Sequence, residues 1–497
     1  MDGVSRNQYN QSVRHRGHLH LPAPGGTATL ASGLVLLLLA LLPPGIYAID
    51  GNSMFAVSWS LAAHGSVSVP CGVDQAAAHG SACYSIWYPL LSFVAVPFTL
   101  AGRGLGGLFG LSQYDVAKET ALVVPALAAA FAGVVAGALA RRLGASSRGA
   151  AAVAVITVFG TEILTYARSF FAETLAALLV VLAVWGAGEA GRRGWVVFGV
   201  AASLVVLAKP PLLVVGVAIG LAEAVSSRRL APLLRRSAAS GAGAALYLLY
   251  NALRFGDPFQ FGGADRFSLR NYVPPKLFEI VGMLVVSPGK GVLWYSPVVA
   301  VGVVLLWRRR REPAAASALA VSVSVLLVYV GHPYGGWDWG DRFLAPVVPL
   351  LCTPLGTTKG RTRLAVAALA VCGLVSQVPT TVGFYERAYA DHTLRGDLTM
   401  LTDRWSLRAS PLVTSWSAMV AEVRDARHTD VSSLAADARA HPRRTGHRLL
   451  STVALWWWMA PVVGVPRAAG FAVWLLVLGA GALLVARRLR APPYFVP

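Results

Sequence analysis

Charged side chains are scarce in this sequence. Asp, Glu, Lys and Arg make up 13% of the 497 residues, whereas hydrophobic residues make up 56%. A soluble globular protein carries charge on roughly a quarter of its residues, so this composition excludes a single water-soluble core. Several apolar runs are long enough to cross a hydrocarbon core of about 30 Å, which predicts an all-α polytopic membrane protein. The clearest runs are 30–49, 120–140, 151–164, 195–208 and 468–486.

Acidic residues are fewer than basic ones, with 23 Asp and Glu against 43 Lys and Arg. Such a charge balance suits nucleic acid, but no aromatic stacking motif accompanies the arginines, so nucleic acid is excluded as a partner. The arginines instead gather in short loops between apolar runs, which is typical of the cytoplasmic loops of a multi-pass cell-membrane protein surrounded by lipid. These loops lie at 141–148, 192–193, 228–236, 308–311, 359–363 and 487–490.

Cysteine is also rare, with four residues in the chain. Cys352 and Cys372 lie in apolar segments and are expected to be buried thiols. Cys71 and Cys83 flank a polar stretch that is expected outside the membrane, where a disulfide between them is favoured. No further ligand set accompanies these cysteines, so we predict no metal site there.

The alternation of arginine loops and apolar runs predicts about twelve spans. No small-residue cleavage site is evident after the first run, so we expect a cytoplasmic tail and a retained first helix that ends near Ile49. In the first outer loop, stretches 53–63 and 88–101 are predicted to lie in the interface as helices. The segment 449–465 is left open between an interfacial helix and a thirteenth span. The predicted domains are a tail 1–28, a transmembrane catalytic module 29–382 with its first outer loop 50–119, an extracytoplasmic domain 383–448, and 449–497 with the interfacial segment, last helix and cytoplasmic tail.

Ionisable residues beside the apolar runs gather on the predicted outer side. A charge at membrane depth is costly, so such residues are candidates for function by default. They come from loops far apart in the sequence, and together they predict one polar, water-facing cleft. The candidates are Asp50, Glu162, Arg168, Glu173, Lys209, Lys290, Asp338, Asp341 and Arg342.

Two stretches carry a resemblance to a known family. Residues 287–297 read SPGKGVLWYSP and residues 335–349 read GGWDWGDRFLAPVVP. With a carboxylate after the first helix and the pair Tyr88–Pro89, they resemble the GT-C superfamily of membrane glycosyltransferases. The nearest branch is that of protein O-mannosyltransferases and lipid A aminoarabinose transferases. The resemblance extends to about residue 382, and the domain after Phe384 is similar to nothing that we can name.

The resemblance implies a GT-C-like bundle and an inverting glycosyltransferase of cell-envelope glycan or glycoconjugate assembly. Its donor would be a sugar on a polyprenyl phosphate, and its acceptor would be a hydroxyl on a lipid, glycan or protein at the outer face. Asp50 would be the general base that takes the acceptor proton. The phosphate would be held by cationic groups and a phenol, in the order Arg342, Lys290, Lys209, Arg168, with Tyr295 donating a hydrogen bond.

One departure from the family concerns the first-loop acid, because many relatives have a second acidic residue directly after it and here Asp50 precedes Gly51. Either Asp50 acts alone or an auxiliary carboxylate comes from elsewhere. Glu173 and Glu162 rank first for that role. With no ligand set evident, a divalent cation stays open as a cofactor.

Each candidate also has a purely structural interpretation. Arg342 could pair with Asp338 or Asp341 as a brace. Lys209 could extend to the lipid headgroups, and Glu173 could simply complement the dipole of the helix that it begins.

Two other functions compete with the transferase. A transporter or flippase of lipid-linked intermediates would place charges near the bilayer midplane and show repeat symmetry, and neither feature is evident. A non-catalytic subunit of an envelope-assembly complex is the third reading. Arabinose and mannose are both reasonable donor sugars, and no residue distinguishes them.

Overall fold

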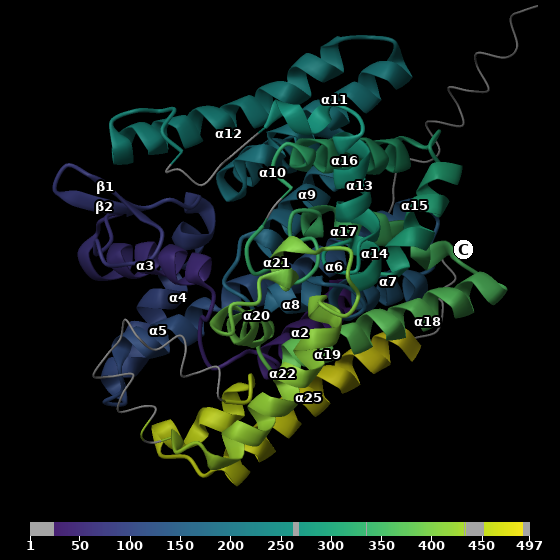
Figure 1. The fold of residues 1–497 in the computed structure, drawn as a ribbon. Helices are drawn as coiled ribbons and strands as arrows, with labels where there is room; N and C mark the ends of the chain where they lie inside the picture. The colour runs from purple at the N-terminus through teal and green to yellow at the C-terminus, as the bar shows by residue number, and fades with distance from the viewer. Residues whose placement is uncertain (1–23, 262–267, 334, 432, 434–451, 491–497) are drawn as a thin grey trace, which may run out of the picture.

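The computed structural model describes residues 24–261, 268–333, 335–431, 433 and 452–490 (Figure 1). The chain is a helical bundle, and the strands among the described residues form a single two-stranded hairpin. The predicted all-helical fold class is confirmed. Residues 1–23 of the predicted tail 1–28 lie outside the described residues. So do residues 434–448 of the predicted outer domain and 491–497 of the predicted C-terminal tail.

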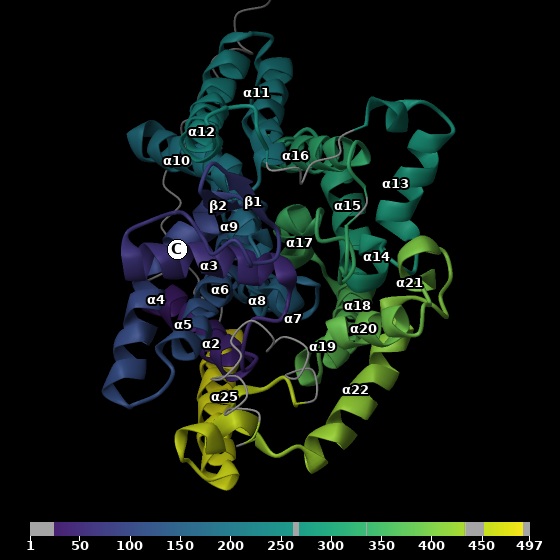
Figure 2. The ribbon, with the colours of Figure 1, turned by 60° about the vertical axis from the view of Figure 1, so that its left-hand side comes forward.

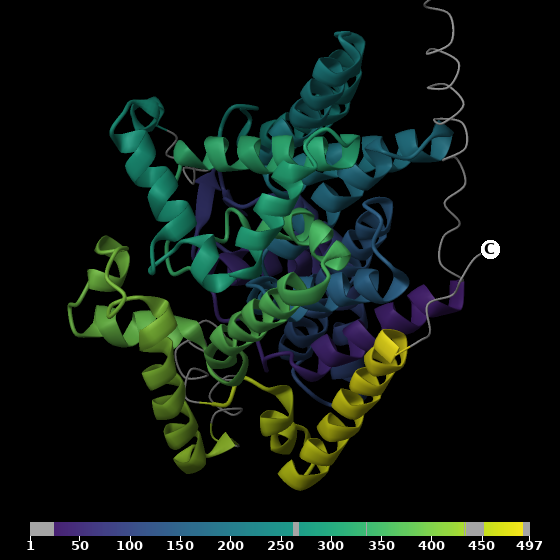
Figure 3. The same cartoon turned by 90° about the vertical axis from the view of Figure 1, so that its right-hand side faces the viewer.

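The first helix among the described residues, α2 (Pro24–Ala40), is shorter than predicted and packs along the last described helix, α25 (Arg467–Arg490) (Figure 3). The apolar run continues to Ile49, but the helix stops before Pro43 and Pro44, which cannot donate helical hydrogen bonds. The prediction that Asp50 ends the first helix is therefore wrong. Asp50 lies in the first turn of the next helix, α3 (Ile49–His64).

The segment after α3 is a compact unit that covers one side of the bundle. It contains the hairpin β1 (Ala76–His79) and β2 (Ala82–Ser85), followed by α4 (Pro89–Leu108) and α5 (Gln113–Ala121). Pro89 begins α4 at a position where its missing N–H costs nothing, and the helix continues through Pro97. This unbroken helix is longer than the predicted interfacial stretch, and by length and composition it could cross a membrane.

Within the described residues, six helices are long and apolar enough to cross a membrane, and five shorter apolar helices accompany them. The protein is therefore a multi-pass membrane protein, while the predicted number of twelve spans is not confirmed. The helices of the central bundle are α6 (Val123–Arg142), α7 (Ser147–Phe159), α8 (Ile163–Ala167), α9 (Glu173–Ala187), α10 (Gly191–Ala208), η1 (Pro210–Leu213), α11 (Val214–Ser227) and α12 (Ala231–Phe255).

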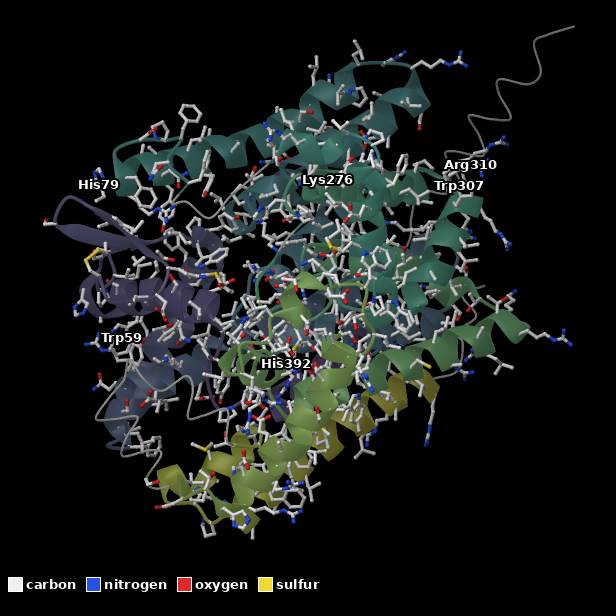
Figure 4. All side chains as sticks on the ribbon, viewed as in Figure 1. Trp59, His79, Lys276, Trp307, Arg310 and His392 are labelled. Atoms are coloured by element: carbon white, nitrogen blue, oxygen red, sulfur yellow. A yellow bond between two sulfur atoms is a disulfide. The ribbon has the colours of Figure 1, made fainter. Side chains whose placement is uncertain are left out.

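The second half of the bundle is built from shorter pieces, interrupted by the two stretches that carry the family resemblance. In chain order they are η2 (Leu269–Tyr272), α13 (Lys276–Val286), α14 (Val292–Tyr295), α15 (Val298–Arg308), α16 (Pro313–Val330), η3 (Ala345–Val347), α17 (Val348–Cys352), η4 (Thr353–Thr357), α18 (Gly360–Ser376) and α19 (Val378–Val382). At the end of α15, Arg310 lies over the Trp307 ring, 4.9 Å from its centroid, at the margin of the molecule (Figure 4). Cys352 is buried as expected, whereas Cys372 is exposed on α18, so that part of the prediction is wrong.

The predicted outer domain is partly helical in its described residues. It contains α20 (Tyr385–Leu394), α21 (Thr399–Thr402) and α22 (Pro411–His428), and α22 packs against α19 and α20 (Figure 2). Its backbone joins the bundle directly, because Gly289 N–H donates to the Arg404 carbonyl at 2.9 Å. In the open segment 449–465, the described helix is η5 (Trp456–Val463), whose eight residues are too short to cross a membrane.

Candidate active site

The sequence-distant Asp50 and Arg342 meet in one ion pair. Arg342 Nη1 donates to Asp50 Oδ2 at 2.8 Å, although 292 residues separate the two along the chain. Asp50 lies in the first turn of α3, where the positive end of the helix dipole favours a carboxylate. Neither side chain is sealed, since Arg342 is 11% exposed and Asp50 is 16% exposed. Both are therefore accessible to a ligand.

A cavity of about 300 Å³ opens beside this ion pair. Its charged lining groups are Asp50, Arg342, Lys209 and Glu173, and the remaining wall is mainly aromatic and aliphatic. Such a mixture suits a ligand with one ionic end and a large apolar part. The full lining consists of Asp50, Met54, Trp87, Tyr88, Phe171, Ala172, Glu173, Lys209, Pro210, Pro211, Phe261, Val328, Tyr329, His332, Arg342 and Phe343.

A second ion pair lies in the cavity wall. Lys209 Nζ donates to Glu173 Oε1 at 2.8 Å, and both side chains are buried. Pro210 and Pro211 end α10 at Lys209, whose side chain is 7% exposed. Lys209 is therefore buried and does not extend to the lipid headgroups, which was its structural interpretation in the sequence. Glu173 does lie in the first turn of α9, where it also complements the helix dipole.

Behind the cavity, the Asp50–Arg342 pair continues into the protein. Asp338 is within 3.0 Å of Arg342 Nε through Oδ1 and accepts from Lys290 Nζ at 2.9 Å through Oδ2. Burial raises the pKa of Asp338, but Lys290 and Arg342, with a smaller contribution from Arg404, outweigh burial and hold that pKa below its usual value. Lys290 is 1% exposed and does not line the cavity. The four residues Asp50, Arg342, Asp338 and Lys290 thus form one chain of alternating charge.

Two further carboxyl groups are packed behind this chain. Asp341 is fully buried and accepts from the Phe343 N–H at 3.1 Å, and burial raises its pKa to about 7. Glu162 is also fully buried beside it. Gly340 separates the two with φ of 64°, and a Cβ there would lie 2.4 Å from a Glu162 carboxylate oxygen. Glycine is therefore required between them.

The structure does not bring Arg168 or Tyr295 to the cavity. The Arg168 guanidinium donates to the carbonyls of Leu41, Thr380 and Ala454, so its donors are already engaged in the protein. The Tyr295 hydroxyl donates to the Pro288 carbonyl at 3.2 Å, and its ring packs against Trp339. Neither residue lines the 300 Å³ cavity, and Arg168 instead lines a second, smaller pocket.

Sequence reasoning missed Gln75 and Trp87. Gln75 Nε2 donates to Asp50 Oδ1 at 2.9 Å, and Gln75 Oε1 accepts from Trp87 Nε1 at 2.5 Å. Gln75 belongs to the stretch between Cys71 and Cys83, which the structure joins as a disulfide. The polar stretch between these cysteines was the available signal, because a disulfide around it was expected from the sequence.

The groups around Asp50 do not fit a divalent cation. Both carboxylate oxygens face N–H donors, one of them on the cationic Arg342. Gly51 leaves no room for the second acid of the family, since a Cβ there would lie 2.8 Å from Ile46 and 3.1 Å from the Phe170 carbonyl oxygen. Among the described residues, no group of three or more His, Cys, Asp or Glu is arranged for a metal ion.

No family model and no curated protein matches the chain. Among solved structures, the chain is similar to ArnT from Cupriavidus metallidurans bound to undecaprenyl phosphate, with 16% identity, a TM-score of 0.47 and coverage of 93% of this chain and 77% of ArnT. It is also similar to the Archaeoglobus fulgidus oligosaccharyltransferase in the apo form, with 12% identity, a TM-score of 0.40 and coverage of 91% and 59%. Both belong to the GT-C superfamily, which the sequence motifs resemble. Because these identities and TM-scores are low, the roles of individual residues rest on the distances and burial within the site itself.

Proposed function

We propose that this chain is an inverting glycosyltransferase that moves a sugar from a polyprenyl-phosphate donor to a hydroxyl acceptor, with Asp50 as general base. The observation that carries the proposal is the Asp50–Arg342 pair at the edge of an otherwise largely apolar cavity. A base and a fixed cation are the two groups that this reaction needs, one for the incoming hydroxyl and one for the departing phosphate.

The two groups act on opposite ends of the reacting centre. The acceptor oxygen attacks the anomeric carbon on the face opposite the phosphate, while its proton passes to Asp50. The bond between the anomeric carbon and the phosphate oxygen breaks, and its electron pair leaves with the phosphate, so the configuration inverts. Arg342 offsets the charge that grows on the phosphate.

The Asp50–Arg342 ion pair suggests how the base becomes available. Arg342 is shared between Asp50 and Asp338. An arriving phosphate competes for the same guanidinium, because Arg binds phosphate through two parallel N–H groups. As Arg342 turns toward the phosphate, Asp50 loses its cation and becomes free to accept a proton. Lys209, paired with Glu173 in the same wall, is the second cation in reach.

The rest of the cavity fits the other part of such a donor. Phe261, Val328 and Pro211 give one wall an apolar surface that water solvates poorly and a prenyl chain solvates well. ArnT was solved with undecaprenyl phosphate bound. We therefore use that lipid as the binding probe for this protein.

The proposal includes an extracytoplasmic site. Glu173 begins α9, whose other end approaches Arg142 through the Arg142–Glu189 ion pair. Lys209 ends α10, which begins beside Arg192 and Arg193. The cavity and the arginine loops are thus at opposite ends of the same helices, and the positive-inside bias puts the arginines in the cytoplasm.

The test uses purified protein in detergent with polyprenyl-phosphate-linked arabinose and mannose as donors and an envelope extract as the source of hydroxyl acceptors. Wild type is expected to transfer one of the sugars, and Asp50→Asn to lower kcat by about 10²- to 10⁴-fold, the usual contribution of a general base. The matched control is Asp74→Asn, which changes an exposed carboxylate of the same loop and should retain wild-type activity.

The outcomes separate the competing functions. Transfer that persists in Asp50→Asn would show that another residue is the base. Movement of the lipid-linked sugar across a proteoliposome bilayer without any transfer would favour a flippase. Binding of undecaprenyl phosphate with neither activity would favour an assembly subunit.

A further inference from the structure

Gln75 stands between the proposed base and the cavity wall. Its amide nitrogen donates to Asp50 Oδ1 at 2.9 Å, and its amide oxygen accepts from the Trp87 indole at 2.5 Å. An indole N–H can only donate, so the amide oxygen must face Trp87 and the amide nitrogen must face Asp50. The orientation of the amide is thereby fixed by the protein.

The backbone at Gln75 is in a conformation that side chains rarely adopt. Its φ is 56°, in the left-handed region that favours glycine. A non-glycine residue persists there only where the surrounding structure holds it, and such positions gather at functional sites. Here the Ile86 N–H donates to the Gln75 carbonyl at 3.0 Å, and Ser53 Oγ lies 3.4 Å from the same oxygen.

The loop that carries Gln75 is fastened to the molecule on both sides. The Cys71–Cys83 disulfide closes it, and β1 pairs with β2 directly after Gln75. On the other side, the buried Arg254 at the end of α12 donates to the Ser85 carbonyl, and at 3.3 Å to the Trp87 carbonyl. These contacts hold the amide at one place relative to Asp50.

We propose that Gln75 is a positioning residue for the Asp50 base, and that Trp87, whose ring lines the cavity, fixes its amide. This inference rests on the proposed function. Gln75 itself does not line the cavity, so it acts through Asp50 and not on a ligand. Its contribution is greatest when Arg342 turns toward the donor phosphate, because the amide then remains as the contact that keeps the carboxylate oriented.

The experiment compares Gln75→Leu and Gln75→Gly with wild type in the transfer assay, using whichever of the two donors is active. Loss of a hydrogen bond to a charged group predicts a kcat about 10- to 100-fold lower. The KM for the donor and the Kd for undecaprenyl phosphate should stay within about twofold, because no ligand contact is removed. The acidic limb of the kcat–pH profile should move to higher pH, since a donor to the charged carboxylate is lost.

Two features of the design keep the result decisive. Gln75→Gly suits the positive φ, so it removes the amide without straining the backbone. Gln113→Leu is the matched control, since Gln113 is an exposed amide of the same segment whose oxygen lies 3.4 Å from Arg103 Nε. That control should keep the wild-type kcat and pH profile.

The inference is overturned if both Gln75 variants retain the wild-type kcat and acidic limb. It is overturned equally if they raise KM at unchanged kcat, which would make Gln75 a binding residue. Either result leaves the proposed function intact as long as wild type transfers sugar and Asp50→Asn does not. If wild type transfers no sugar from either donor, the proposed function fails and Gln75 loses its role with it.

Discussion

The charged residues near the site form two groups that the same loops supply but that face different surroundings. The cavity group, Asp50, Arg342, Lys209 and Glu173, lines the 300 Å³ cavity. The buried group, Lys290, Asp338, Asp341 and Glu162, lies behind it, each member at most 1% exposed. Charges that can reach a ligand are free to change partners during a reaction, whereas sealed charges depend on the partners they have. Changes in the first group should therefore alter kinetics, and changes in the second should alter stability.

The largest expected effect is in the buried group. Lys290→Met leaves Asp338 sealed with Arg342 as its ion-pair partner among the described residues, and breaking a buried ion pair costs about 3–5 kcal/mol. The midpoint of thermal unfolding in detergent should fall clearly. At low temperature, the folded fraction should still bind undecaprenyl phosphate with the wild-type Kd. A weaker Kd at an unchanged midpoint would instead make Lys290 a direct phosphate ligand, as the sequence motif predicted.

The next effect is in the cavity group. Arg342→Gln removes the guanidinium that binds Asp50 and that would bind a phosphate. The Kd for undecaprenyl phosphate should rise by about 10- to 100-fold, because one or two hydrogen bonds to a charged group are lost. Isothermal titration or fluorescence quenching measures this Kd. Arg310→Gln, which changes an arginine at the margin of the molecule, is the control and should bind as wild type does. An unchanged Kd in Arg342→Gln would reduce Arg342 to a structural brace for Asp338.

The smallest effect concerns Asp341 and depends on pH. Burial raises its pKa to about 7 from a usual value near 4, with Asp338 adding repulsion and Lys290, the Phe343 N–H and Lys209 opposing the rise. The folded protein then holds this proton more tightly than the unfolded chain does, so stability is lost as pH rises from about 4 to about 7.

Asp341→Asn keeps the oxygen that accepts from Phe343 and removes the buried charge. The thermal midpoint at pH 8 should therefore be higher than that of wild type by a few degrees, and the gain should shrink toward pH 5. A lower midpoint at pH 8 would mean that the Asp341 charge itself stabilises the fold, and the distinction between the two groups would then be weaker.

Some of the site could be predicted because its signals are local. Apolar runs and arginine loops indicate the bundle from composition alone. Asp50 and Arg342 each occur in a recognisable sequence context, and the structure brings them to 2.8 Å. Glu173 and Lys209 were predicted from their places at the ends of apolar runs, and they pair in the cavity wall.

Other features were missed, either because they depend on tertiary packing or because their local signal was outweighed. Lys290 and Arg168 were both predicted to hold the donor phosphate, Lys290 with the higher rank. In the structure Lys290 pairs with Asp338, and Arg168 donates to three carbonyl oxygens. The end of the first helix was misplaced because hydrophobicity was weighed above the two prolines that stop it. Gln75 was missed because an uncharged amide carries no electrostatic cost that would mark it.

The most direct test of the central claim is a structure of the protein in lipid nanodiscs with undecaprenyl phosphate bound. The phosphate should lie in the 300 Å³ cavity within about 2.7–3.2 Å of the Arg342 guanidinium, with Asp50 released from Arg342 and still bonded to Gln75. A phosphate bound outside this cavity, or an Asp50–Arg342 pair unchanged beside it, would contradict the account.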